Sequence, residues 1–352
     1  MTLFTPLRLR EIELKNRIGV SPMCEYSAKE GHPTSWHLVH LGSRAVGGAG
    51  LVLTEATAVQ AIGRISPADT GIYTDSHIAS WKPIADFIRE QGAVPGMQLA
   101  HAGRKASTAV PWQGGAKVEP SDGGWEPVAP SAIAFDTNYP HPRTLTIAEI
   151  DQIVEDFRAA AKRALAAGFE VVEVHAAHGY LAHEFLSPFS NLRTDEYGGS
   201  FENRARFPLR IAKAVREEWP EKWPVLVRIS ATDWKEGGWD LAQSIELCRR
   251  FKALGIDLID VSSGGMLPGV KIPVGPGYQV KFAEAIRREA GIATGAVGML
   301  TDPAQVETVL STGQADMVFL ARELLRDPYW PRRAAQELGA KIKPPVQYER
   351  AW

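Results

Sequence analysis

The sequence predicts a single (β/α)8 barrel, and three observations support this fold class. Eight short β-rich segments alternate with longer amphipathic segments along the 352 residues. The β-rich segments are almost continuously apolar, which is typical of parallel strands covered on both faces by helices. No G-x-G-x-x-G turn occurs, although an open doubly wound sheet usually has one after its first strand. Eight strand–helix units of this kind close into a barrel.

The predicted elements follow one another with little interruption. The expected strands are Ile18–Ser21, Leu51–Glu55, Val94–His101, Phe169–His175, Val225–Ser230, Leu258–Ser262, Ala293–Val297 and Met317–Ala321. Apolar residues at helical spacing predict helices over Ile150–Ala167, Asn203–Trp219, Leu241–Leu254 and Val280–Glu289. The glycines expected to end helices are Gly50, Gly92, Gly168, Gly255, Gly291 and, slightly further upstream of its strand, Gly313. Glycine suits this place because the residue after a helix often adopts the left-handed conformation.

Two segments are too long to be plain connections. Residues 102–146 follow the third strand and are rich in Pro, Gly and Trp, so we expect a lid there. A second long segment runs from Tyr180 to about Phe201. Both follow strands and therefore belong to the carboxyl-terminal face, where barrel active sites lie. We expect one domain over residues 1–352, ending in a tail at 341–352.

Composition and charge exclude several classes of protein. The chain is 45% hydrophobic and 23% charged with a formal net charge of −2, so no basic stripe indicates a nucleic-acid partner. No segment approaches the roughly 20 apolar residues of a membrane span, and the first ten residues do not resemble a signal peptide. Cys24 and Cys248 form neither a C-x-x-C pair nor a zinc spacing. We therefore expect a cytoplasmic enzyme in a reducing setting, with no metal and no membrane partner.

Chemically capable side chains gather where the fourth predicted strand ends, at His175, His178 and Tyr180. Structural histidines beside a helix cap would look the same. A metal site would need a third ligand, usually a carboxylate. In a redox enzyme, the two histidines would donate hydrogen bonds to a substrate carbonyl or nitro oxygen, and Tyr180 would supply a proton.

Two polar residues lie inside apolar strands. Arg228 needs an anionic partner if it is buried. That partner is either a core carboxylate such as Glu173 or the anionic edge of a reduced flavin, and its position near a strand end favours the flavin. Gln98 must satisfy both a donor and an acceptor, which a flavin pyrimidine ring would do. A structural glutamine would give the same pattern.

The last two strands predict a phosphate site, and the first strand is followed by a cysteine. Gly298 allows close approach of the backbone, and Arg322 offers two parallel hydrogen bonds to a phosphate. An ordinary helix start with a surface arginine is the alternative. Cys24 is either a nucleophile with a histidine base or a group that lies against a flavin ring and tunes its potential. Cys248 lies within a predicted helix and is a buried apolar residue.

A set of short motifs occurs in one order along almost the whole chain, from Leu3 to Trp352. They are Leu14–Ile18, Ser21–Cys24, Glu55–Val59, Gln98–Lys105, His175–Leu181, Arg193–Ser200, Asn203–Arg204 and Gln347–Trp352. Through these motifs the chain resembles the Old Yellow Enzyme family of NADPH dehydrogenases and ene-reductases, in particular its bacterial thermophilic-like subclass. One departure is Ala321-Arg322, where members often have Gly-Arg. A backbone N–H survives this change, so phosphate binding should too.

The resemblance implies cofactors and a role for each site residue. Non-covalent FMN would be bound by Ser21, Pro22, Met23, Cys24, Ala58, Gln98, Arg228, Gly298, Ala321 and Arg322. Substrate would be held by Tyr26, His175 and His178, while Tyr180 would be the proton donor. Cys24 would then be the flavin-tuning cysteine rather than a nucleophile. Arg350 and Trp352 would reach a neighbouring subunit's active site, which implies a homodimer or homotetramer.

The implied reaction has two halves. NADPH reduces FMN, and the flavin N5 then passes a hydride to the β-carbon of an activated alkene (an enone, nitroalkene, maleimide or xenobiotic) while Tyr180 protonates the α-carbon. One rival is a metal- or cysteine-dependent barrel hydrolase that uses His175, His178 and Cys24. Another is a flavin- or phosphate-binding sensor. A dienoyl-CoA-reductase-like enzyme would need an iron–sulfur cysteine cluster, which two scattered cysteines do not provide.

Overall fold

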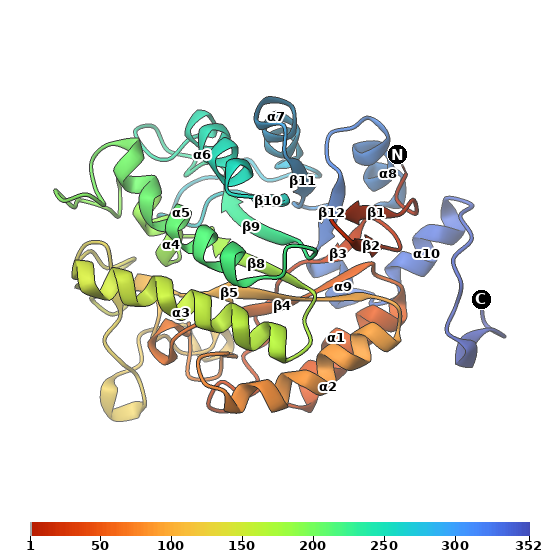
Figure 1. Ribbon diagram of the computed structural model, residues 1–352, viewed down its shortest axis with the longest axis horizontal. Coiled ribbons are helices and arrows are strands. Elements are labelled where there is room, and N and C mark those ends of the chain that lie inside the picture. The colour runs from red at the N-terminus through yellow and green to blue at the C-terminus, as the bar shows by residue number, and fades with distance from the viewer. Residues whose placement is uncertain (1) are drawn as a thin grey trace.

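The computed structural model describes residues 2–352 and contains a closed barrel of eight parallel strands ringed by helices (Figure 1). The barrel strands are β3 (Ile18–Val20), β4 (Leu51–Ala58), β5 (Val94–Ala100), β8 (Val171–Ala176), β9 (Val225–Ser230), β10 (Leu258–Ser262), β11 (Ala293–Ala296) and β12 (Met317–Leu320). Neighbours in the chain are neighbours in the barrel, and β12 pairs with β3 to close it. The predicted fold class and all eight predicted strands are confirmed. The largest difference at a carboxyl end is in β4, which runs to Ala58 rather than Glu55.

Helices cover the outside of the barrel between successive strands. They are α1 (Ser35–Gly47), α2 (Ser76–Glu90), α3 (Ile147–Ala166), α5 (Phe201–Glu218), α6 (Leu241–Ala253), α7 (Val280–Ala290), α8 (Pro303–Ser311) and α10 (Trp330–Glu337), with short α4 (Leu181–Leu186) and α9 (Arg322–Arg326). The four helices predicted from periodicity are confirmed within a few residues. In α3, a capping box fixes the start, because the Thr146 hydroxyl accepts from the Glu149 N–H and the Glu149 carboxylate accepts from the Thr146 N–H.

The glycine before β4 has a different role from the one predicted. Gly50 does not end α1, because Gly48 occupies the left-handed position there with φ 105°. A side chain at Gly50 would instead lie 2.6 Å from the backbone oxygen of Asn16. Close packing against the segment before β3 is therefore the reason for glycine at this position. Gly92 and Gly168 adopt the left-handed conformation as predicted, with φ of 67° and 92°.

An N-terminal hairpin, which the sequence analysis did not predict, closes one end of the barrel. It consists of β1 (Leu7–Leu9) and β2 (Ile12–Leu14). Its four buried side chains pack in one cluster with the first residues of barrel strands, including Leu51 and Leu258. Figure 1 shows the hairpin beside β12, at the end opposite the extended yellow segment that follows β5. The hairpin thus forms a floor, and the carboxyl-terminal ends of the strands face the other way.

The long segment after β5 contains only short elements. It has 3-10 helices at Gly103–Lys105, Pro111–Gln113 and Pro120–Asp122, and a two-stranded pairing of β6 (Val128–Ala129) with β7 (Arg143–Thr144). Its base is held by Arg193, whose Nη1 donates to the backbone oxygens of Pro130 and Leu145. The second long segment contains α4. Within residues 2–352, no helix has the length and apolar character to cross a membrane.

Candidate active site

The turn after β8 brings together the three residues that the sequence singled out. His175 lies on the strand, His178 lies in the turn, and Tyr180 is the residue that precedes α4. The His175 ring centroid lies 5.2 Å from that of His178 and 5.0 Å from that of Tyr180, edge to face in both cases. His178 and Gly179 both have positive φ, 60° and 73°. This reversal of the backbone brings the rings of His178 and Tyr180 to the His175 ring.

Burial fixes the protonation state of these groups. It lowers the pKa of His175 and of His178 well below 6.5, and the positive charge of Arg228 adds to the effect. Burial also raises the pKa of Tyr180 well above 10. At neutral pH the site therefore holds two neutral imidazoles and a protonated phenol. His178 Nε2 lies 2.7 Å from Ser262 Oγ, whereas His175 Nδ1 is buried with no partner among residues 2–352.

A polar layer lies within the neighbouring strands. The Gln98 amide donates to Glu173 Oε1 at 2.8 Å, and Arg228 Nε lies 3.0 Å from Asp260 Oδ2. Arg228 thus has a core carboxylate as a partner, as one of the two predicted alternatives, but the carboxylate is Asp260 and not Glu173; the flavin contact stays a prediction. Asp260 takes this place because it is directly opposite Arg228 in the register of β9 and β10. Burial and the nearby Asp260 raise the pKa of Glu173, whose Oε2 has no partner in the described chain.

A cavity of about 290 Å³ lies where β11 and β12 end. Its lining includes Ser262, Tyr278, Gln279, Gly298, Ala321, Arg322 and Arg326. Gly298 has φ 127°, and a side chain there would lie 2.8 Å from the Gln279 amide nitrogen. A guanidinium group and a closely packed backbone glycine are suited to holding a phosphate. The structure thus brings Gly298, Ala321 and Arg322 together as the sequence predicted.

The segment after β3 carries the remaining predicted residues. The Ser21 hydroxyl is buried and has no partner among residues 2–352, and Pro22 and Met23 are half-buried. Ala58 ends β4, the strand that pairs with β3. Tyr26 packs edge to face on Trp112 of the long segment after β5, with centroids 5.8 Å apart.

Cys24 is a neutral thiol in this setting. Burial raises its pKa well above 9, and the nearby carboxylates of Asp69 and Glu55 add to the shift. A cysteine nucleophile requires the thiolate and usually a base in hydrogen-bonding contact. Within residues 2–352, no histidine makes a hydrogen bond to Cys24, and no group of three His, Cys, Asp or Glu is placed to hold a metal ion. These observations favour the flavin-tuning interpretation over the hydrolase.

Lys105 is a site residue that the sequence analysis did not single out. Its Nζ donates to the backbone oxygen of His178 at 2.7 Å and to that of Gly265, and it lies 4.0 Å from the Phe135 ring centroid. Burial lowers its pKa to about 7. A lysine shortly after the end of a barrel strand was the available signal, because such positions face the active site.

The C-terminal tail lies against α10 of its own chain. The Tyr348 ring centroid is 6.2 Å from that of Tyr329, and Arg332 Cζ is 5.9 Å from the centroid of Trp352. Figure 1 shows the tail standing outside the barrel next to α10. Among residues 2–352, Arg350 and Trp352 make no hydrogen bond or ring contact with the turn after β8. Their role in a neighbouring subunit stays a prediction.

Residues 2–341 match the profile of the NADH:flavin oxidoreductase / NADH oxidase family. The chain belongs to this family. It is 51% identical over 352 residues to an NADPH dehydrogenase of Geobacillus sp. (strain WCH70), covering 99% of this chain and 98% of that one. The family membership confirms the resemblance to the Old Yellow Enzymes.

Solved structures of family relatives support the same fold. An old yellow enzyme homologue from Zymomonas mobilis superimposes with a TM-score of 0.80 at 27% identity, over 99% of this chain and 96% of that one. A 2-naphthoyl-CoA reductase complex gives a TM-score of 0.87 at 28% identity over 96% of this chain. The chain spans about half the length of that reductase, 52%.

The site fits the FMN of this NADH:flavin oxidoreductase family. The cavity at the ends of β11 and β12 has an arginine for the phosphate and no room for a side chain at Gly298. Buried polar atoms without a partner among residues 2–352, such as Ser21 Oγ and His175 Nδ1, are available to a bound ligand. The chain is therefore a flavin-dependent oxidoreductase, and the predicted cofactors, FMN and NADPH, are those of its family.

Proposed function

We propose that this enzyme is an ene-reductase that reduces activated alkenes such as enones, nitroalkenes, maleimides and related xenobiotics. One observation carries the proposal: strand β8 and the turn after it present a neutral imidazole, His175, in ring contact with a second neutral imidazole, His178, and with the protonated phenol of Tyr180. Hydrogen-bond donors and a proton donor at one place suit a reaction in which negative charge develops on a substrate oxygen and a carbon atom must be protonated.

The chain supplies binding groups along the whole cofactor. Gly298, Ala321 and Arg322 would hold the FMN phosphate, and Gln98 and Arg228 would face the polar edge of the flavin ring. Ser21 to Cys24 and Ala58 would complete the binding site. When bound, FMN accepts a hydride from NADPH and supplies it to the alkene. The neutral thiol of Cys24 would lie against the ring as a weak donor without adding charge.

The residues of the turn would polarise the substrate and protonate it. Because His175 and His178 are neutral, each imidazole has one N–H to donate to the carbonyl or nitro oxygen of the alkene. These bonds strengthen as negative charge grows on that oxygen. Tyr180 keeps its proton at neutral pH and transfers it from Oη to the α-carbon. Tyr26 would hold the substrate from the segment after β3, next to Trp112 of the long segment after β5.

The proposal includes a homodimer or homotetramer in which Arg350 and Trp352 enter a neighbouring subunit's active site. Large apolar side chains exposed on the surface support it. They are Trp36, Leu38 and Val39 at the start of α1, and Val346, Tyr348 and Trp352 in the tail. Burial of such side chains in a subunit interface would remove them from water. The two free cysteines fit the reducing, cytoplasmic setting expected from the sequence.

The test separates the two halves of the reaction in Tyr180→Phe. Under anaerobic conditions, NADPH should bleach the flavin of the variant at nearly the wild-type rate. Return of the flavin spectrum with 2-cyclohexen-1-one should be slower by about 10²- to 10⁴-fold, the usual contribution of a positioned proton donor. Tyr73→Phe, which removes a hydroxyl bonded to the Glu30 carbonyl outside the turn, is the control and should alter neither rate.

Two outcomes would contradict the proposal. Equal slowing of both half-reactions would exclude Tyr180 as the specific proton donor. If NADPH bleaches the flavin spectrum but enones, nitroalkenes and maleimides do not restore it, the enzyme would be a flavin reductase with another electron acceptor.

A further inference from the structure

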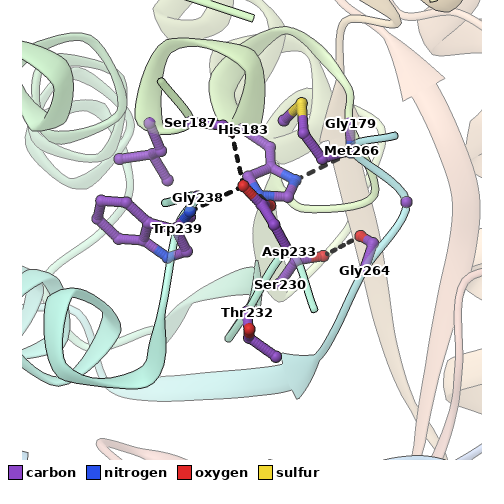
Figure 2. Close-up of polar contacts among 12 residues, drawn as sticks. Gly179, His183, Ser187, Ser230, Thr232, Asp233, Gly238, Trp239, Gly264 and Met266 are labelled. Carbon is purple, nitrogen blue, oxygen red and sulfur yellow. Dashed lines mark hydrogen bonds and ion pairs between the residues drawn. The ribbon is translucent and has the colours of Figure 1, made fainter. Parts of the chain in front are cut away.

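Behind the turn after β8 lies a buried histidine–carboxylate pair, His183 and Asp233 (Figure 2). His183 is on α4, and Asp233 follows β9. Both side chains are fully buried, and neither was among the predicted site residues. Figure 2 shows the imidazole between Gly179 of the turn and the Asp233 carboxylate.

One hydrogen bond from the turn defines which ring nitrogen of His183 carries the proton. The backbone N–H of Gly179 donates to His183 Nδ1 at 2.9 Å, so this nitrogen carries no proton. The ring proton is therefore on Nε2, which faces the Asp233 carboxylate with Oδ1 at 3.1 Å, a close contact of opposite polarity rather than an aligned hydrogen bond. Which nitrogen of a histidine is protonated depends on the partner of the other one, and the Asp233 carboxylate on the Nε2 side favours the same tautomer by its charge.

Asp233 is held as a carboxylate by its surroundings. Burial opposes its ionisation, but His183, the Ser187 hydroxyl at 2.6 Å and the Trp239 N–H at 2.8 Å outweigh burial and keep its pKa below the ordinary range. Ser187 bonds to Asp233 and not to His183, and all three side chains are buried. This arrangement is therefore no hydrolytic triad, because the serine has no base and no access to a substrate.

The turn needs this support because its backbone is unusual. His178 is a non-glycine residue with φ 60°, and it is followed by Gly179 with φ 73°. Such a conformation persists only where surrounding contacts determine it. A side chain on Gly179 would collide with the Gly265 carbonyl oxygen, so the turn also has no room to relax.

Each N–H of the turn has its own acceptor. His178 N–H donates to Ser230 Oγ at 2.9 Å, Gly179 N–H to His183 Nδ1, and Tyr180 N–H to the Ala177 carbonyl at 3.1 Å. The Gly179 bond lies between the two residues that would touch the substrate. A shift of this peptide would move His178 and Tyr180 together.

We propose that His183 and Asp233 are positioning residues, which hold the His178–Tyr180 turn in its productive geometry by fixing the His183 tautomer. The inference rests on the proposed function, since it assumes that Tyr180 donates the proton. Asp233 keeps the ring proton on Nε2, and this leaves Nδ1 free to accept from Gly179. Misplacement of a reacting group by about 1 Å costs on the order of 10²-fold in rate.

Three variants of the FMN-loaded enzyme test the proposal, with one matched control. His183→Leu removes the acceptor. Asp233→Asn keeps the shape but removes the charge that favours a proton on Nε2, so Nδ1 can carry the proton and then no longer accepts from the Gly179 N–H. His183→Gln retains an acceptor and a donor. The control is Ser244→Ala, which removes a buried hydroxyl bonded to Trp239 Nε1 and the Ala231 carbonyl, behind the same network but not touching the turn.

The first readout is independent of activity. In protein labelled with ¹⁵N-glycine, exchange of the Gly179 amide hydrogen should accelerate by at least about tenfold in His183→Leu and Asp233→Asn. It should stay near the wild-type rate in His183→Gln and Ser244→Ala. Unchanged exchange in Asp233→Asn would overturn the proposal even if His183→Leu failed to fold.

The second readout is the rate at which 2-cyclohexen-1-one reoxidises the reduced flavin. Loss of about 10- to 100-fold in Asp233→Asn and His183→Leu, with recovery in His183→Gln, is expected. A larger D₂O effect on this rate would show that proton transfer has become limiting. Faster Gly179 exchange with unchanged reoxidation would make the pair merely structural and overturn the inference. Normal reoxidation in Tyr180→Phe would instead remove the proposed proton donor, a separate result.

Discussion

Replacement of Glu184 by Gln should stabilise the protein at neutral pH, although it removes a side chain that makes a hydrogen bond. Glu184 is fully buried, and its Oε1 accepts from the Arg104 N–H at 2.8 Å. Its Oε2 has no partner among residues 2–352. Burial raises the pKa of Glu184 to about 8, against the opposing effects of Arg104 and Lys105. The folded protein therefore holds this carboxyl in its neutral form at pH 7.

The size of the effect follows from proton uptake on folding. In the unfolded chain, Glu184 titrates near 4.5, which is two and a half pH units below pH 7. Folding at pH 7 must therefore add a proton to a carboxylate that is ionised in the unfolded chain. At about 1.4 kcal/mol per unit, this lowers the free energy of unfolding by about 3 kcal/mol at pH 7, and the cost reaches its maximum above pH 8. Glutamine resembles the protonated acid and has no such cost. The stability that the neutral carboxyl provides is complete below pH 4.5 and is lost as the pH rises through 8.

The assay is urea unfolding of wild type and Glu184→Gln at pH 5 and pH 7, with exposed Glu236→Gln as the control. The advantage of Glu184→Gln should be small at pH 5 and about 3 kcal/mol at pH 7. For Glu236→Gln, the difference in the free energy of unfolding from wild type should not increase comparably between pH 5 and pH 7. A wild type that becomes the more stable protein as the pH rises would show that Glu184 is ionised and paired with Arg104 or Lys105, and would refute the reasoning.

Three further predictions concern the cofactor and the tail. Gly298→Ala should weaken FMN binding at least tenfold by fluorescence titration, because its methyl group would lie 2.8 Å from the Gln279 amide in a backbone with φ 127°; unchanged affinity would place the phosphate elsewhere. Deletion of Arg350–Trp352 should raise KM for the alkene in the assembled protein, and unchanged kinetics would make the tail structural. Cys24 should react slowly with iodoacetamide up to about pH 9, because burial raises its pKa, and rapid labelling at pH 7 would contradict a neutral thiol.

The barrel strands were predictable because each buries an apolar run on both faces. The hairpin at Leu7–Leu14 was not, since strands of three residues are too short to show a period of two. The choice between Gly48 and Gly50 as the end of α1 depends on backbone angles that two nearby glycines in one sequence do not distinguish. Local patterns thus predict long elements better than their boundaries.

The site was predictable as a set of strand ends but not as a network of contacts. His175, His178 and Tyr180 come together because they follow one strand within a few residues. The partner of Arg228 depends on the register between β9 and β10, which places Asp260 opposite it. Such pairings come from tertiary structure. Lys105 and Asp233 contact the turn or its neighbours from distant segments, and His183, although only four residues from Gly179, was missed because its contacts depend on how α4 packs.

The closure of the barrel by β3 and β12 has a consequence for synthesis of the chain. The Val318 N–H donates to the Arg17 carbonyl at 2.9 Å, and the Leu3 N–H donates to Glu307 at 2.8 Å. Strand β3 therefore leaves the ribosome early but gains its second neighbour only when almost the whole chain has emerged. Until then, an apolar strand edge near the N-terminus stays open to pairing with other nascent chains. We therefore expect this strand edge to need protection during translation, although in the folded barrel it is paired with β12.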